Sequence, residues 1–182
     1  MEAALERFVR YGYHKTTVDE IARHAHVGKG TIYFYFKNKE DILQTLVDRE
    51  LTKGFVEISK AIMEEPSFTQ RLRKLIKISI EYFHQNDLIS KVMAQDPDVV
   101  LSVIADKNRE FQKLSVSGIK AILDEGNKRG EFREVDSEKV GYIIDSLLRS
   151  FHYLAYLGLE AYSPEDIIEP LCDLLISGLE TR

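Results

Sequence analysis

A cluster of hydrogen-bond donors lies within residues 16–43, which read TTVDEIARHAHVGKGTIYFYFKNKEDIL. Lysine ammonium and threonine hydroxyl groups flank four consecutive aromatic residues, YFYF, two of which are tyrosines. Such groups donate hydrogen bonds to phosphate oxygens and fix a protein on a nucleic-acid backbone. The alternative for any one tyrosine is a half-buried packing role, but the flanking lysines favour phosphate binding for the set. The candidate phosphate donors are Thr17, Thr31, Tyr33, Tyr35, Lys37 and Lys39.

The charge distribution points to the same region. The chain has a net charge of −5, yet the segment from Arg10 to Lys39 holds six Lys and Arg against Asp19 and Glu20. This segment therefore carries +4 and the other residues carry −9. A basic segment on an acidic body binds phosphate locally, while the acidic remainder discourages indiscriminate association. A chance distribution of solvated charges is the alternative that composition alone leaves open.

Other kinds of chemistry have weaker support. His24 and His26 are spaced like two metal ligands, but no third ligand converges on them, which favours ordinary exposed histidines. The aspartates near Pro97 fit helix-start chemistry better than a cation site. The sequence has no P-loop, no glycine-rich dinucleotide fingerprint and no recognisable nucleophile arrangement. We therefore expect no enzyme activity, no catalytic residue, no metal and no cofactor.

Composition sets the broad class of the protein. The 182 residues are 44% hydrophobic and 30% charged, enough to bury a core. A single cysteine, Cys172, excludes an intrachain disulfide and leaves too few thiolates for a cysteine-based zinc site. No apolar run approaches the roughly 18 residues of a membrane span, and no signal peptide is visible. We expect a cytoplasmic protein without a membrane partner.

Helical periodicity and capping signals predict an all-α fold of about nine helices. Thr17-x-x-Glu20 is a capping box that opens a short helix. A tight turn at His26-Val27-Gly28 precedes a second short helix, and Pro170 should kink or disturb the last one. The other breaks fall near Gly12, Pro66, Pro97 and Gly130. The predicted helices cover 2–11, 17–25, 29–35, 39–63, 68–83, 98–128, 137–158 and 164–179.

The two short helices with their turn have the pattern of a helix-turn-helix motif, whose second helix enters the major groove of DNA. Ile32 and Phe36, with part of Phe34, are expected to pack inward, and the residues between them to point outward. The inward set predicted around them is Leu5, Phe8, Val9, Tyr13, Ile21, Ala22, Ala25 and Val27.

The segments AALERF, GYHKTTVDEIA and VGKGTIYFYFKNKEDIL resemble the DNA-binding domain of the TetR family of bacterial transcriptional regulators. LDEGNKRGEFREVDSEKV (123–140) is similar to a segment before the dimerisation helices of many members. The resemblance implies base reading by Lys29 and Gly30, and phosphate contacts by Thr17, Thr31, Tyr33, Tyr35 and Lys39. Two departures are His26, where the family usually has Gly in a turn that requires positive φ, and Gly28, where it usually has Ser or Ala.

The same resemblance implies a DNA-binding domain at 1–46 and a ligand-binding and dimerisation domain at 47–182. Mixed aromatic, Met and His side chains of the second domain could line an apolar pocket, although plain core is the more common role of such residues. The predicted pocket residues are Tyr82, Phe83, Met93, Phe111, His152 and Tyr156. The last two helices offer apolar faces for a four-helix dimer interface, with packing inside one chain as the alternative. The predicted interface residues are Ile144, Leu148, Phe151, Ile168, Leu171 and Leu175.

These expectations describe a homodimeric repressor that binds a palindromic operator in double-stranded DNA and is released by a small, apolar effector. The alternative is a helical binding or interaction module with weak or lost DNA binding. That alternative is motivated by Gly28, the net negative charge and the absence of the basic arm that precedes the first helix in most members.

Overall fold

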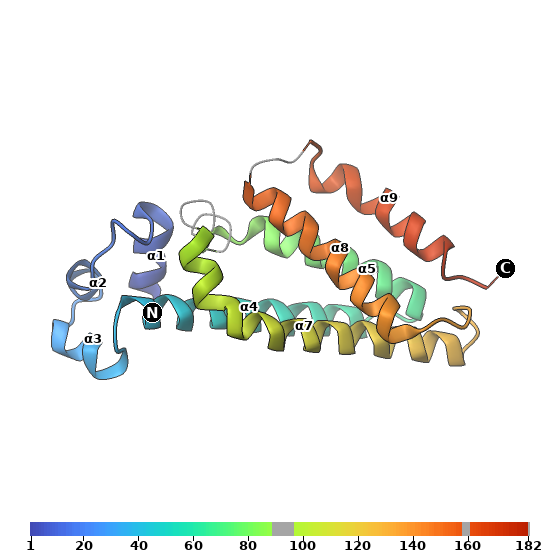
Figure 1. Cartoon of the computed structure of the whole chain (residues 1–182), viewed down its shortest axis with the longest axis horizontal. Coiled ribbons are helices and arrows are strands. Elements are labelled where there is room, and N and C mark those ends of the chain that lie inside the picture. Colours follow the sequence, from blue (N-terminus) through green and yellow to red (C-terminus); the bar gives the residue numbers. More distant parts are fainter. Residues whose placement is uncertain (89–96, 158–160, 182) are drawn as a thin grey trace. The chain divides into compact units, whose positions relative to one another are not determined.

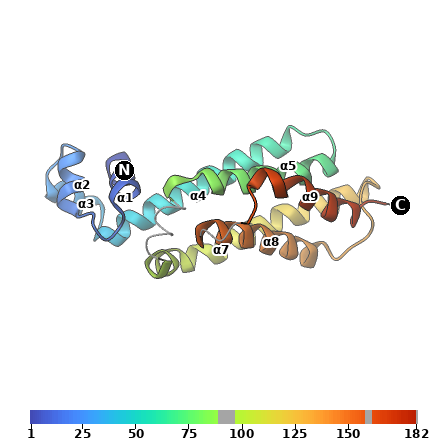
Figure 2. The ribbon, with the colours of Figure 1, turned by 90° about the horizontal axis from the view of Figure 1, so that it is seen from above.

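A computed structural model describes residues 1–88, 97–157 and 161–181; of 97–108, 152 and 155–157 it describes the backbone only. The described residues form eight helices and no strand, with an isolated bridge between Phe132 and Glu180 (Figures 1 and 2). The all-α prediction is confirmed, and the predicted count of about nine compares with eight described. The helices are α1 (Glu2–Tyr11), α2 (Val18–His24), α3 (Lys29–Tyr35), α4 (Lys39–Met63), α5 (Phe68–Gln85), α7 (Pro97–Lys128), α8 (Ser137–Leu157) and α9 (Pro164–Ser177).

The helix ends coincide with the capping signals of the sequence. The Asn38 side chain accepts a hydrogen bond from the Asp41 amide at 2.8 Å at the start of α4. Ser163 and Asp166 form a capping box before α9, which continues through Pro170. Gly130 adopts a φ of 74° just after α7, a conformation that glycine adopts without the steric cost of a Cβ atom.

The chain forms two compact units. Unit 1 comprises Met1–Lys53 and Asn86–Asn108, and unit 2 comprises Gly54–Gln85 and Arg109–Arg182. Helix α4 therefore contributes its first part to unit 1 and its last part to unit 2. The predicted domain boundary after Leu46 falls inside unit 1.

The core of unit 1 joins α1, α2 and the first turns of α4. Its inner residues include Phe8, Ile21 and Leu43, and Ile32 and Phe36 of the α3 region pack against it as predicted. Two expectations were wrong: the side chain of Val27 is exposed, and that of Phe34 is 81% exposed rather than partly buried. The remaining buried members are Ala4, Val18, Ile42, Leu46, Val47 and Leu88.

The core of unit 2 is built from α5, α7, α8 and α9, and α5 packs on both α8 and α9 (Figure 1). Close approaches occur at two glycines. A Cβ atom at Gly126 would lie 2.3 Å from the Phe132 ring, and one at Gly54 would lie 2.5 Å from the Tyr82 ring. Contacts this short cannot form, so glycine is required at both positions for the packing observed.

The six residues of the predicted dimer interface all pack, wholly or in part, against the core of unit 2, and their contact with a second copy stays a prediction. Ile144, Leu148 and Ile168 are buried in the core of unit 2, so their side chains are covered by their own chain. Phe151, Leu171 and Leu175 are partly buried against the same core. An amphipathic pattern shows that a face is buried but not which partner covers it. Among the described side chains of these two helices, the exposed large apolar ones are Tyr142, Ile143, Leu147, Tyr153, Leu154 and Leu174.

Candidate nucleic-acid interface

The α2–turn–α3 segment has the geometry of a helix-turn-helix motif. Helix α2 ends at His24, with Ala25 as its C-cap, and His26 adopts a φ of 54°. The Val27 amide donates a hydrogen bond to the Ala22 carbonyl oxygen at 3.0 Å. The predicted positive φ at His26 is thereby confirmed. A left-handed conformation costs a non-glycine residue on the order of 1 kcal/mol, and the hydrogen bond of the turn holds the residue there.

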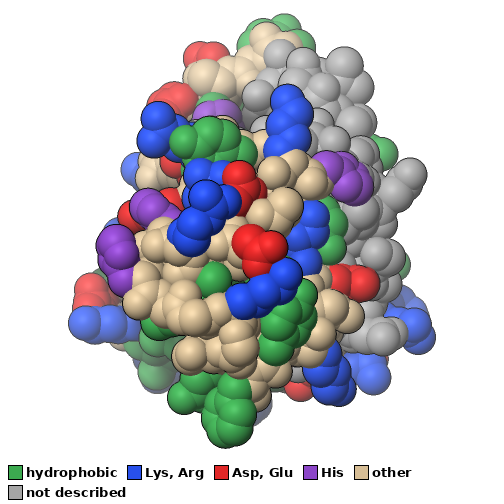
Figure 3. All heavy atoms as spheres, turned by 90° about the vertical axis from the view of Figure 1, so that its left-hand side faces the viewer, with side chains coloured by type: hydrophobic (Ala, Val, Ile, Leu, Met, Phe, Trp, Pro, Cys, Tyr) green, Lys and Arg blue, Asp and Glu red, His purple; other side chains and the backbone are tan. Residues whose placement is uncertain are grey.

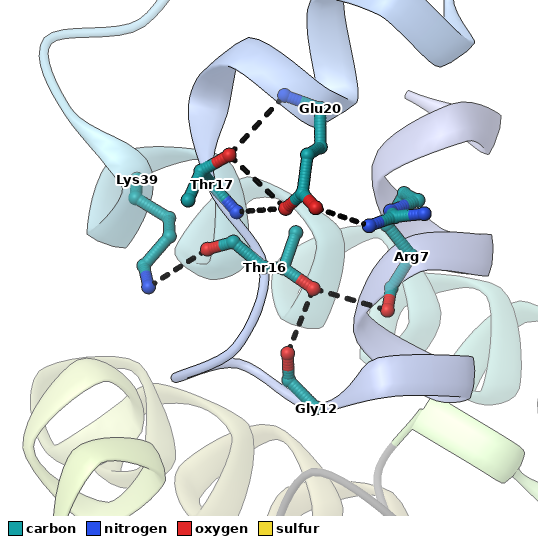
Figure 4. Close-up of polar contacts among 6 residues, drawn as sticks. All are labelled: Arg7, Gly12, Thr16, Thr17, Glu20 and Lys39. Carbon is teal, nitrogen blue, oxygen red and sulfur yellow. Dashed lines mark hydrogen bonds and ion pairs between the residues drawn. The ribbon is translucent and has the colours of Figure 1, made fainter.

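One carboxylate fastens α2 to α1 (Figure 4). The Thr17 amide donates to one Glu20 oxygen at 2.9 Å, and the Thr17 hydroxyl accepts from the Glu20 amide, as predicted for a capping box. The other Glu20 oxygen pairs with the Arg7 guanidinium at 2.9 Å. Hydrogen bonds from Thr17, aided by the Arg7 charge, lower the pKa of Glu20, so this link persists at neutral pH.

The loop between α1 and α2 is held by two further polar side chains. The hydroxyl of Thr16 is buried and lies 2.8 Å from the Gly12 carbonyl oxygen and 3.1 Å from that of Arg7. The Lys39 ammonium, at the start of α4, donates to the Thr16 carbonyl oxygen at 3.0 Å (Figure 4). It also donates to the Tyr13 carbonyl oxygen at 2.8 Å. It also lies 4.2 Å from the centre of the Tyr13 ring, and its burial lowers the pKa of Lys39.

Two predicted phosphate donors are thus engaged within the chain. The Thr17 hydroxyl donates to the Glu20 carboxylate at 3.0 Å, and the Lys39 ammonium is directed at backbone carbonyl oxygens. Both residues position α2 and its preceding loop. Their phosphate contacts stay predictions.

The remaining candidate donors lie on the exposed surface of α3 and just beyond it. Thr31, Tyr33 and Tyr35 are exposed, as is Lys37. Nothing lies within 4 Å of the position that a Cβ atom at Gly30 would occupy, so this part of the helix backbone is open. In the space-filling view, Lys and Arg side chains are spread over the surface and hydrophobic side chains gather at its lower edge (Figure 3).

Lys29, the predicted base-reading lysine, has an acidic neighbour. Its ammonium lies 2.8 Å from the Asp19 carboxylate and 6.0 Å from the centre of the Tyr33 ring. The hydrogen bond to Asp19 raises the pKa of Lys29. Both side chains are about half exposed, so this ion pair is weak and the ammonium can exchange Asp19 for a base edge. The pairing joins residues ten positions apart across the turn, and no local sequence signal predicts it.

The start of α3 is weakly capped. Gly28 occupies the N-cap position and, having no side chain, makes no capping hydrogen bond of the kind that a serine could make there. The helix nonetheless begins there, because the Gly28 carbonyl oxygen accepts from the Thr31 amide at 2.9 Å.

The predicted pocket residues are only partly located. Tyr82 and Phe83 are half-buried neighbours on α5, with ring centres 5.7 Å apart and nearly perpendicular planes. Phe111 is half-buried on α7. His152 and Tyr156 lie on α8 but their side chains are outside the described part of the chain, as is the whole of Met93. The convergence of these six residues on one pocket stays a prediction.

Metal and membrane chemistry have no support in the described part of the chain. No group of three His, Cys, Asp or Glu side chains is placed there to hold a metal ion. Instead, His24 Nε2 lies 2.6 Å from a Glu6 carboxylate oxygen. Within 1–88, 97–157 and 161–181, no helix has the length and apolar character that crossing a membrane requires.

Comparison with known proteins gives this geometry a context. Residues 1–46 match the family described as bacterial regulatory proteins, tetR family, and residues 88–181 match the QacR-like protein, C-terminal region. The fatty acid metabolism regulator protein of Bacillus subtilis is 26% identical over 186 residues, which span all of this chain and 94% of that protein. The transcriptional regulator QacR of Staphylococcus aureus is 25% identical over 133 residues, 71% of this chain and 69% of that protein.

Solved structures share the fold over nearly the whole length. The transcriptional regulator FadR of Bacillus subtilis, in complex with stearoyl-CoA, superimposes with a TM-score of 0.76 at 27% identity, over 97% of this chain and 96% of that one. A transcriptional regulator of Cytophaga hutchinsonii has a TM-score of 0.82 at 24% identity, over 99% and 96% of the two chains. From the helix-turn-helix geometry and the matches of residues 1–46 and 88–181, the chain belongs to the tetR family and is a DNA-binding transcriptional regulator.

Proposed function

We propose that the chain is a homodimeric repressor that binds a palindromic DNA operator and is released from it by a small apolar effector. The observation that best supports DNA recognition is the exposed surface of α3. Ile32 and Phe36 fix this helix by packing against the core of unit 1. Lys29 and the open backbone at Gly30 read bases, and the hydroxyls of α3 with Lys37 contact phosphates. The alternative of a module with lost DNA binding is not favoured, because the turn, the capping box of α2 and the exposed surface of α3 are all present.

A dimer supports this function by symmetry. Two copies related by a two-fold axis present two α3 helices to successive major grooves, which lie about 34 Å apart, and so match a palindrome. The exposed apolar side chains of α8 and α9, among them Ile143, Leu147 and Leu174, are the surface that we assign to the second copy.

The effector proposed for the first test is a long-chain acyl thioester. The support is the relative of known structure that binds stearoyl-CoA and is 27% identical over 97% of this chain. Aromatic side chains on α5 and α7, such as Tyr82, Phe83 and Phe111, suit an acyl chain. Release requires that the effector bind the DNA-free conformation more tightly, since equal affinity for both conformations shifts nothing.

Helix α4 is the element through which release would act. It supplies residues to both compact units, and its first residue, Lys39, holds the α1–α2 loop through the contacts with Tyr13 and Thr16. A displacement of the Gly54–Met63 part of α4 would therefore reach the DNA-reading motif along one continuous helix.

Fluorescence anisotropy with a labelled duplex that the protein selects from a random pool tests release. We expect stearoyl-CoA to weaken DNA binding at least tenfold, whereas coenzyme A alone and stearate at the same concentrations leave it unchanged. If stearoyl-CoA has no effect while the duplex still binds, the effector class is wrong and DNA recognition stands.

A further inference from the structure

Phe34 is the most exposed large hydrophobic side chain in the described part of the chain, at 81%. Single exposed apolar residues are ordinary on protein surfaces, so exposure alone decides nothing. The position of Phe34 on its helix is more informative. Ile32, which packs against the core, lies two residues earlier on α3, a rotation of about 200° at 100° per residue. Phe36, the residue after the end of α3, packs against the same core. Phe34 therefore points away from the core, at the centre of the exposed surface of α3.

The neighbours of Phe34 leave this centre apolar. Gly30 lies four residues earlier, about 40° away on the same face, and no side chain or other segment lies within 4 Å of the position that a Cβ atom there would occupy. The ring of Phe34 meets that of Tyr35 edge to face, with centres 5.1 Å apart and planes at 87°, which limits the orientations of the ring. Lys29 and Tyr33 lie to one side of this centre, and Thr31 and Tyr35 to the other. The exposed surface of α3 thus has Gly30 and Phe34 at its centre and hydrogen-bond donors on both sides of them.

An apolar ring cannot read the hydrogen-bonding edges of bases. The apolar feature that distinguishes base pairs in the major groove is the 5-methyl group of thymine. We propose that Phe34 is a specificity-determining residue that contacts a thymine 5-methyl group in the major groove, and that Gly30 lets the helix come close enough for this contact. The proposal rests on the DNA-binding function and adds to it the kind of base pair read at the centre of each half-site.

Replacement of thymine by uracil isolates this contact, because uracil lacks only the methyl group. Duplexes selected from a random pool by the full chain are resynthesised with uracil at one thymine of each half-site in turn, and their affinities are measured by competition. We expect uracil at one position per half-site to weaken binding about fourfold, the ratio that corresponds to the burial of one methyl group. In the Phe34→Ala variant the same substitution should have no effect, since the ring that reads the methyl group is gone.

Phe55→Ala is the matched control, because Phe55 is another exposed phenylalanine and belongs to unit 2. It should keep the full uracil penalty, and the helical circular dichroism of both variants should equal that of the parent. Equal affinity for uracil and thymine duplexes at every position, or the same uracil penalty in Phe34→Ala as in the parent, would overturn the proposal and leave DNA binding intact. Selection of no duplex at all would overturn both.

Discussion

The Lys39→Met substitution separates a positioning role from a phosphate contact. Methionine keeps an unbranched stem but removes the ammonium that donates to the Tyr13 and Thr16 carbonyl oxygens at 2.8 and 3.0 Å. Hydrogen bonds from charged donors contribute about 1.5–3 kcal/mol each, and the cation–π contact about 0.5–1 kcal/mol. The ammonium is partly desolvated and the carbonyl groups can regain water, which offsets much of that sum. We expect the net loss to be about 2 kcal/mol, confined to the α1–α2 loop and α2.

Amide hydrogen exchange measures this loss where it occurs. The Thr16 amide donates to the Tyr13 carbonyl oxygen at 3.3 Å, so its protection reports on the loop. A loss of about 2 kcal/mol corresponds to roughly 30-fold faster exchange. Lys37→Met is the matched control, because the exposed Lys37 contacts Asp41 through its backbone amide rather than its side chain. Its exchange rates should stay within the range of about ±0.5 kcal/mol that surface substitutions produce.

DNA binding supplies the second half of this test. A lysine that neutralises one phosphate contributes about 0.9 to the slope of log affinity against log salt. Lys37→Met should therefore flatten the slope by about 0.9, whereas Lys39→Met should weaken binding with the slope unchanged. A Lys39→Met variant with normal exchange at Thr16 and a flatter slope would refute the positioning role and restore Lys39 to the phosphate contacts.

Three other substitutions or reactions test separate parts of the account. Gly30→Ala should stabilise α3 by up to about 1 kcal/mol in urea unfolding and yet weaken DNA binding at least tenfold; unchanged affinity would exclude a close approach of the backbone to DNA. Asp19→Asn should release Lys29, strengthen binding to any duplex and steepen the salt slope, whereas Asp173→Asn, which disrupts a pair with Arg73 in unit 2, should change neither. Cys172 should resist iodoacetamide at pH 8 in the folded protein, because burial raises the pKa of its thiol to about 11; rapid alkylation would contradict its burial.

The elevated pKa of Cys172 also fixes the sign of a stability effect. Burial favours the neutral thiol over the thiolate. The contribution of the buried thiol to the free energy of unfolding is fully present below the ordinary thiol pKa of 9.0. It is lost as the pH rises through the folded-state pKa of about 11. Acidification below neutral pH leaves this contribution unchanged.

The local features of the fold were predictable because short-range signals determine them. The Thr17–Glu20 capping box and the positive φ of His26 each depend on a few neighbouring residues. Phe34 was misplaced although the same 100° rotation that puts Ile32 and Phe36 inside puts Phe34 outside.

Long-range contacts were not predictable in the same way. The Lys39 ammonium reaches carbonyl oxygens 23 and 26 residues earlier, and the sequence around Lys39 is equally compatible with an exposed lysine. The burial of Ile144 and Ile168 was ambiguous for a related reason, because an apolar helix face fits its own chain or a second copy equally well. Only the three-dimensional packing of α5 against α8 and α9 decides between them.

Selection from random-sequence DNA tests most directly whether this chain recognises a specific palindrome through α3. The full chain is incubated with random-sequence duplex DNA at about 150 mM salt, and the bound fraction is sequenced after repeated selection. We predict enrichment of a palindrome whose half-sites are spaced by about one helical turn or a multiple of it. A folded protein that enriches no sequence, and whose weak binding disappears with salt, would contradict the account.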